Sequence, residues 1–315
     1  MPDHWEGERC VGRSGSTVSI LPTAAILAAI LFWGSSFAAM KVMIAEAGPW
    51  TVMWVRMAVA LLVISPFVHR LWPLPYRHGD WKLIFPFVLF QPCLYFTLEA
   101  NALRFTSSSQ AGLISASVPL LVALGSYFTL KEKVTWATIL GLFISLGGVV
   151  WLTLAGDPSE AASDPVLGNL LEFGAMLTAA GYVLLVKRLS DRYNPWALTA
   201  MQIVAGFLFF LPGAVPLFTN KFEALTFPQI AALFYLGAFV TLGAFGFYNY
   251  GIAHIPANRA VAFVNLIPVV AVILGWSILG ETLNGPQTAA ALCVLAGVWL
   301  SQWGGKTGVT EIHEV

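Results

Sequence analysis

Residues 22–45 read PTAAILAAILFWGSSFAAMKVMIA, and the charged residue of this stretch, Lys41, lies near its end. A helix needs about 20 mostly apolar residues to cross the hydrocarbon core of a bilayer. The stretch is long enough, so it predicts a transmembrane helix.

The rest of the chain repeats this pattern. Further apolar segments cover residues 51–69, 83–102, 108–130 and 134–154, and then 168–187, 196–218, 228–250, 259–279 and 287–303. Short separators rich in proline, glycine and charged residues divide them. We therefore predict an all-α integral membrane protein with ten transmembrane helices.

Composition agrees with a membrane protein. Hydrophobic residues make up 58% of the 315 residues and charged residues only 10%, against roughly 25% charged in soluble domains. The lipid bilayer is therefore the first expected partner. The net charge is zero, which gives no reason to expect nucleic acid as a partner. Cys10, Cys93 and Cys293 lie far apart, without metal-ligand spacing, and we interpret them as packing residues.

Lysine and arginine predict the orientation, because loops rich in them stay in the cytoplasm. They gather in the N-terminal tail and in the separators after the second, fourth and sixth segments. Both tails, residues 1–20 and 305–315, are thus expected in the cytoplasm, with the protein in the cytoplasmic (inner) membrane. The first 20 residues are polar, so a cleaved signal peptide is not expected.

Comparing the sequence with itself indicates two repeats, residues 21–155 and 156–304. At an offset of 146 residues Lys41 matches Lys187, and at an offset of 149 Glu132 matches Glu281. Five helices per repeat is an odd number, so the second copy must enter the membrane from the opposite side. Two inverted five-helix repeats are typical of alternating-access transporters, whose substrate site lies between the repeats.

The sequence also resembles the EamA-type drug/metabolite transporters along nearly its whole length. The resemblance rests on Trp33-Gly34-Ser35-Ser36-Phe37 with Lys41, Arg56, Ala102-Leu103-Arg104-Phe105, Pro119, Lys131-Glu132-Lys133, Pro268 and Gly280-Glu281-Thr282. It implies ten helices in two repeats and export of amino acids or related metabolites. Nucleotide-sugar and sugar-phosphate carriers are more distant relatives of this family and remain an alternative.

Polar and aromatic residues that share helix faces are the candidates for a substrate site. They are Trp33, Ser36, Tyr95, Glu99, Ser115, Tyr182, Thr241, Tyr248 and Asn265. Pro119 and Pro268, at equivalent positions, either kink their helices or act as hinges. Each candidate also has a structural interpretation, because Trp and Tyr anchor helices at membrane interfaces and small residues such as Ser115 serve helix packing.

Charged residues inside a membrane are costly and are functional candidates. Lys41, Arg56 and Glu172 are expected near helix ends, where they can reach the interface. Glu99 is the strongest charged candidate, either paired with Lys41 or binding an amine. Without a carboxylate at the midplane, facilitated diffusion or exchange is as plausible as proton coupling.

An integral membrane enzyme or a channel would need different signals. The five histidines lie in tails or at loop edges, and neither a catalytic motif nor a filter-like loop is evident. We therefore expect a secondary transporter and not an enzyme, without a cofactor or metal. Its expected partner is a small-molecule substrate, a neutral or aromatic amino acid or a related metabolite. A monomer is expected, since the chain contains its own pair of repeats.

Overall fold

The computed structural model describes residues 20–71, 74–130, 135–156, 158–160, 162–219, 225–255, 260 and 263–304. These residues form helices and no β-strand, which confirms the all-α prediction. The predictions for residues 1–19 and for the C-terminal tail lie outside the described residues, and so do those for Cys10 and for Lys131, Glu132 and Lys133.

The described residues of the first half form nine helical elements. They are α1 (Ile20–Ala47), α2 (Pro49–Ile64), η1 (Ser65–Arg70), α3 (Trp81–Val88), η2 (Leu89–Leu94), α4 (Tyr95–Phe105), α5 (Ser108–Ser115), α6 (Val118–Leu130) and α7 (Trp136–Leu154). Segment η2 is a π-helix that joins α3 to α4.

The second half follows the same order of long and broken helices. Its elements are α8 (Pro165–Leu189), α9 (Pro195–Phe209), η3 (Leu211–Ala214), α10 (Val215–Phe218), α11 (Phe227–Phe234), η4 (Tyr235–Ala244), α12 (Phe245–His254), η5 (Phe263–Leu266), α14 (Ile267–Leu279) and α15 (Gly285–Gly304). Segment η4 is again a π-helix, here between α11 and α12.

Seven helices of the described chain are long and apolar enough to cross a membrane. An eighth results if Pro195–Phe209 and Leu211–Phe218, which meet at 62°, count as one bent span. Pro212 lies at this bend and has no N–H to continue the helix, so the segment predicted for 196–218 is bent. The last two predicted spans are shorter apolar helices, Phe263–Leu279 and Gly285–Ser301, so the count of ten stays a prediction.

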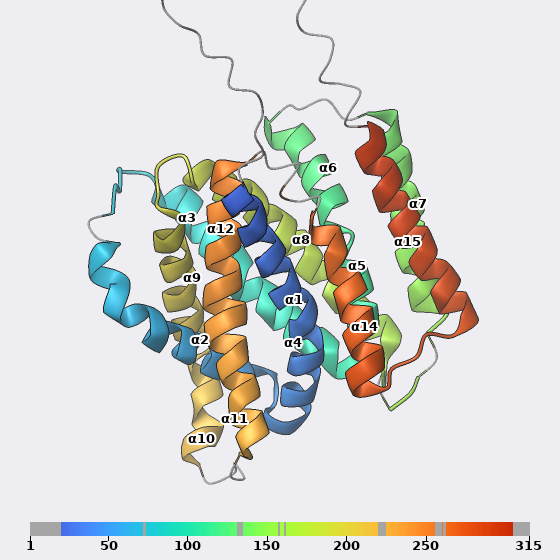
Figure 1. Cartoon of the computed structure of the whole chain (residues 1–315), viewed down its shortest axis with the longest axis horizontal. Coiled ribbons are helices and arrows are strands. Elements are labelled where there is room, and N and C mark those ends of the chain that lie inside the picture. The colour runs from blue at the N-terminus through green and yellow to red at the C-terminus, as the bar shows by residue number, and fades with distance from the viewer. Residues whose placement is uncertain are drawn as a thin grey trace, which may run out of the picture.

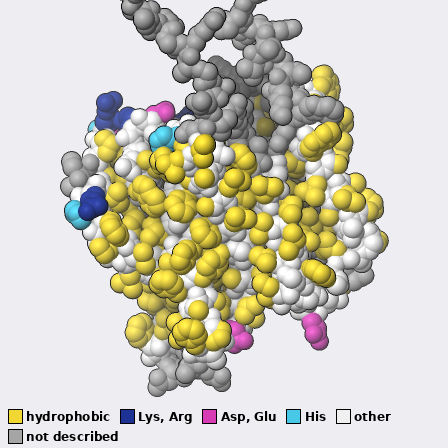
Figure 2. Space-filling model, in the orientation of Figure 1, with side chains coloured by type: hydrophobic (Ala, Val, Ile, Leu, Met, Phe, Trp, Pro, Cys, Tyr) yellow, Lys and Arg dark blue, Asp and Glu magenta, His cyan; other side chains and the backbone are white. Residues whose placement is uncertain are grey.

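The surface has the polarity expected in lipid. Figure 2 shows hydrophobic side chains covering most of the visible face, with Lys and Arg gathered toward one end and acidic side chains at both ends. Large apolar residues such as Phe128 and Trp136 are 73% and 82% exposed. Helix α1 begins and α15 ends at the basic end (Figures 1 and 2).

Helices from the two halves pack against each other throughout the bundle. Helix α1 lies against α12 and α14, α4 against α8, and α2 against η4 (Figure 1). The central helices of one half are therefore in contact with those of the other, which places any cavity between them within reach of residues from both halves.

Helices α7 and α15 form a pair at one side of the bundle (Figure 1). A methyl group on Gly141 would lie 2.4 Å from the carbonyl oxygen of Gly297, and one on Gly148 would lie 2.8 Å from the backbone nitrogen of Val294. Such close approach requires small residues, so Gly141 and Gly148 serve the packing of these two helices.

Candidate functional site

A cavity of about 610 Å³, a volume that includes the space at its mouth, lies among helices from both halves. Helices α1, α2, α4, α5, α6, α8, α12 and α14 line it, together with η2 and η5. Of the nine predicted site residues, seven lie on its wall: Trp33, Ser36, Tyr95, Glu99, Ser115, Tyr182 and Tyr248.

Two spans lose regular α-helical hydrogen bonding, at η2 on the cavity wall and at η4, which holds the wall residue Arg56 through Thr241. In η2, Gln91 has non-helical backbone angles (φ −138°, ψ 114°), and Pro92 follows without an N–H. In η4, the hydroxyl of Thr241 donates to the carbonyl of Leu236 at 2.8 Å. Segments of π-helix are frequent at functional sites because they redirect side chains, and here η2 turns Gln91 into the cavity.

Arg56 is the buried cation of the cavity. It is 1% exposed, its Nε donates to the hydroxyl of Thr241 at 2.8 Å, and its guanidinium lies 4.2 Å from the ring centre of Phe96. The expectation that Arg56 reaches the membrane interface is therefore wrong. It sits two turns into α2 between helices of both halves, where aromatic and hydroxyl partners replace water.

Glu99 faces the same cavity and accepts a hydrogen bond of 2.6 Å from the hydroxyl of Tyr95. Arg56 attracts this carboxylate electrostatically. The predicted pairing of Glu99 with Lys41 is wrong, because the Lys41 ammonium donates to the carbonyls of Leu103 and Thr106, each at 2.7 Å. Lys41 thus binds the C-terminal end of α4, where the helix leaves carbonyls without partners.

Aromatic rings form the apolar side of the cavity. Trp33 lies 4.9 Å from Tyr248 and 5.4 Å from Phe245, and Phe245 lies 5.9 Å from Phe96, all between ring centres. The hydroxyl of Tyr182 donates to Asn249 at 2.6 Å. By contrast, the hydroxyl of Tyr248 is buried without a hydrogen-bond partner among the described residues.

The small polar candidates differ in position. Ser36 and Ser115 line the cavity, but their hydroxyls donate within their own helices, to Trp33 at 2.7 Å and Gly112 at 2.6 Å. Thr241 is not on the wall and instead holds Arg56. Asn265 is not on the wall either, because the 3₁₀ segment η5 turns its neighbour Val264 inward.

The two prolines predicted as kinks or hinges occupy helix starts. Pro119 is the second residue of α6, directly after the turn that ends α5, and Pro268 is the second residue of α14, directly after η5. Proline suits the first turn of a helix because the N–H groups there have no helical acceptor. Both residues therefore mark breaks between short helices, and their action as hinges stays a prediction.

The carboxylate of Glu281 binds the first N–H groups of helix α5. Its Oε1 accepts from the backbone N–H of Ser108 at 2.8 Å, and its Oε2 accepts from the N–H and hydroxyl of Ser109 at 2.9 and 2.6 Å. A carboxylate is favoured there by the helix dipole. Glu281 therefore caps the N-terminal end of α5 from the second half of the chain.

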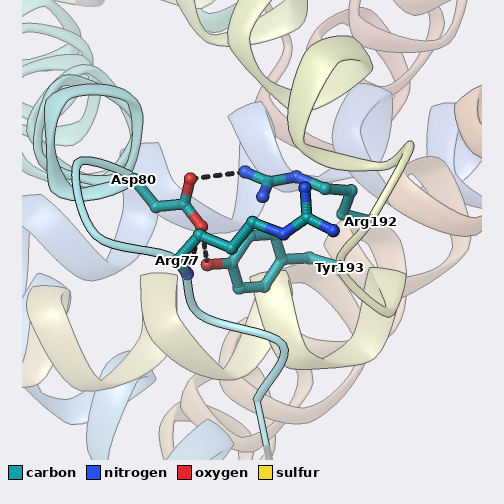
Figure 3. A network of polar contacts seen from close by, with 4 residues as sticks. All are labelled: Arg77, Asp80, Arg192 and Tyr193. Atoms are coloured by element: carbon teal, nitrogen blue, oxygen red, sulfur yellow. Dashed lines mark hydrogen bonds and ion pairs between the residues drawn. The ribbon is translucent and has the colours of Figure 1, made fainter.

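At the basic end, a polar network ties the two halves together (Figure 3). Asp80, which precedes α3, binds the guanidinium of Arg192 and accepts from the hydroxyl of Tyr193 at 2.7 Å, and both partners follow α8. The backbone N–H of Arg77 donates to Asp80 at 2.9 Å. These bonds, first that from Arg77, lower the pKa of Asp80 to about 2, while burial and the bond to Asp80 raise the pKa of Tyr193 to about 12.

A multi-pass helical bundle with a polar and aromatic cavity between its halves is the architecture of a membrane transporter. The sequence profile of the EamA-like transporter family matches residues 21–154 and again 166–303. The chain belongs to this family.

Relatives agree with this class. The protein named uncharacterized transporter YcxC of Bacillus subtilis is 29% identical, over 88% of this chain and 92% of its own length. The WAT1-related protein At3g02690 of Arabidopsis thaliana is 26% identical, over 91% of this chain and 70% of its own. A solved structure with 18% identity superposes with a TM-score of 0.62, covering 92% of this chain and 98% of that one, and shows that the fold is shared.

Proposed function

We propose that this transporter carries neutral or aromatic amino acids and related metabolites out of the cell by alternating access. The observation that carries the proposal is the composition of the cavity wall. Arg56 and Glu99 offer one positive and one negative group, which match the carboxylate and ammonium of an amino acid. The rings of Trp33, Phe245 and Tyr248 offer an apolar wall for its side chain.

Ten helices in two inverted repeats would give this site its two-sided access. The pattern of contacts supports the repeats, because Lys187 donates to the carbonyls of Ile252 and Ile255 at 2.9 and 3.5 Å. Lys41 makes the equivalent contacts in the first half, to residues that precede these two by 149 positions. The lining supports them as well, since Phe96 and Phe245, and likewise Glu99 and Tyr248, are 149 positions apart.

Both termini lie in the cytoplasm in this proposal. The basic end, at which α1 begins and α15 ends, then faces inward, in keeping with the positive-inside rule. A single chain holds both repeats and would work as a monomer.

Counterflow in proteoliposomes tests the proposed cargo. Vesicles containing purified protein are loaded with one unlabelled compound, and entry of the same labelled compound is followed against empty liposomes. We expect transient accumulation of L-phenylalanine and other neutral amino acids, weakened by Glu99→Gln. Accumulation of only sugar phosphates or nucleotide sugars from the same panel would contradict the proposal.

A further inference from the structure

Glu172, in the second turn of α8, carries a fully buried carboxyl. It is 0% exposed, and neither of its oxygens has a hydrogen-bond partner in the described part of the chain. An ionised carboxylate in such surroundings is strongly disfavoured, and a bound proton removes its charge. The environment of Glu172 is thus that of a proton-binding group.

Glu99 is the acidic neighbour of Glu172. Helix α4, which carries Glu99, packs against α8, and the two carboxyls repel each other electrostatically when both are charged. Glu99 lies on the cavity wall, whereas Glu172 does not. Of the two carboxyls, Glu99 is therefore the one that borders the space from which a proton can arrive.

Arg56 is the positively charged side chain that interacts with Glu99 in the carboxyl pair formed by Glu99 and Glu172. Arg56 comes from α2, and Tyr95 from α4 donates to Glu99. Lys41 from α1 is held by two backbone carbonyls and interacts electrostatically with Glu281. Cys93 on η2, Tyr182 on α8 and Tyr248 on α12 are buried titratable side chains of adjoining elements, and each is uncharged in its protonated form.

Arg56 can balance one carboxylate, and the hydrogen bond from Tyr95 favours Glu99 as that carboxylate. Two ionised carboxyls beside one guanidinium would leave a net negative charge inside the bundle. A single proton on the second carboxyl removes it.

We propose that Glu172 holds a proton that it exchanges with water in the cavity through Glu99. As a step in transport this rests on the proposed carrier function, but the proton site exists independently of any cargo. A cargo whose ammonium approaches Glu99 would bring a second positive charge and allow Glu172 to lose its proton. A zwitterionic cargo would leave the proton in place.

Infrared spectroscopy of the purified full-length protein at neutral pH tests the site without cargo. The C=O stretching band of a protonated carboxyl is separate from the bands of carboxylates. We expect this band in the native protein and in the control variant Glu46→Gln, whose side chain is exposed on α1. We expect its loss in Glu172→Gln and a stronger band in Arg56→Gln, in which Glu99 loses its counter-charge.

Transfer to heavy water tests the route. The band shifts as deuterium replaces the proton, and the shift should be slower in Glu99→Gln than in the native protein. An unchanged band in Glu172→Gln, or no band in the native protein, would overturn the proton site. Equal exchange rates in Glu99→Gln would overturn the route through Glu99. Glu172→Gln breaks no hydrogen bond of the described structure, and size-exclusion elution verifies its folding.

Discussion

Arg56 of the first half donates from Nε to the hydroxyl of Thr241 in the second half at 2.8 Å, across the segment where helix η4 departs from α-helical geometry. This bond fixes a buried cation on the cavity wall. It links the stability of the bundle to the geometry of the site, because both residues are buried, each with 1% exposure.

Replacing Thr241 by valine should test that bond. The guanidinium would lose a charged hydrogen bond worth about 1.5–3 kcal/mol, so we expect a lower unfolding temperature and weaker counterflow. Thr97→Val is the matched control, since the hydroxyl of Thr97 only donates to the carbonyl of Cys93 four residues earlier. Equal stability of the two variants would contradict a structural role for the Arg56–Thr241 bond.

Two tyrosines of the cavity should respond differently to loss of their hydroxyls. Tyr182→Phe removes a buried bond to Asn249 and should lower stability by roughly 1 kcal/mol. Tyr248→Phe removes a hydroxyl that has no hydrogen-bond partner among the residues the structure describes, so stability should hold while affinity for the amino acid falls up to about tenfold. Thermal unfolding and the KM of transport measure the two effects, and the reverse pattern would refute the assignment.

Two adjacent glycines of α7, Gly147 and Gly148, test how closely this helix packs against α15. In Gly148→Ala the new methyl group would meet the backbone nitrogen of Val294 at 2.8 Å, which should cost about 1–3 kcal/mol. Gly147→Ala meets no atom within 4 Å and should leave stability unchanged or raised. Thermal unfolding of the two variants gives the comparison, and equal losses would contradict the close contact.

The network around Asp80 should make stability depend on acid. Because the pKa of Asp80 falls from 3.8 to about 2 in the folded protein, its contribution is complete above the ordinary value and is lost as the pH falls from about 4 toward 2. Asp80→Asn should remove this part of the acid dependence, whereas Asp191→Asn, at an exposed neighbouring position, should retain it. Unfolding curves recorded across this pH range decide between the two.

If Glu172 holds a proton, the net charge of the cargo should determine whether that proton is released during transport. In proteoliposomes with an internal pH dye, uptake of phenethylamine should release a proton from the site, while L-phenylalanine, which is zwitterionic, should not. Glu172→Gln should abolish the signal of the amine. A proton signal of the same size for both compounds would refute the charge balance.

The sequence was sufficient for the helical membrane fold and for much of the cavity wall. Trp33, Tyr95 and Glu99 could be predicted because helical periodicity places them on faces that also carry other polar or aromatic groups. Periodicity failed for Asn265, since η5 is a 3₁₀ segment with a different side-chain spacing. The repeat offset of 149 would have selected Val264 as the partner of Ser115, and Val264 is the residue on the wall.

The roles of Arg56 and Glu172 could not be predicted from the sequence. Both lie in the first turns of apolar helices, where a charged side chain can extend to the interface as well as into the bundle. The choice depends on the neighbours, Phe96 and Thr241 for Arg56 and the facing helix α4 for Glu172, and these come from distant parts of the chain. Their charge inside an apolar segment was the available signal.

Cargo protection of one cysteine tests most directly whether amino acids bind in the cavity. Ser115→Cys, in a chain whose three native cysteines are replaced by serine, places a thiol on the wall. Its reaction with a membrane-impermeant thiol reagent is followed in proteoliposomes with and without L-phenylalanine. The account predicts slower labelling when L-phenylalanine is present. Labelling at the same rate, by a protein that still accumulates L-phenylalanine in counterflow, would place the cargo elsewhere and contradict the account.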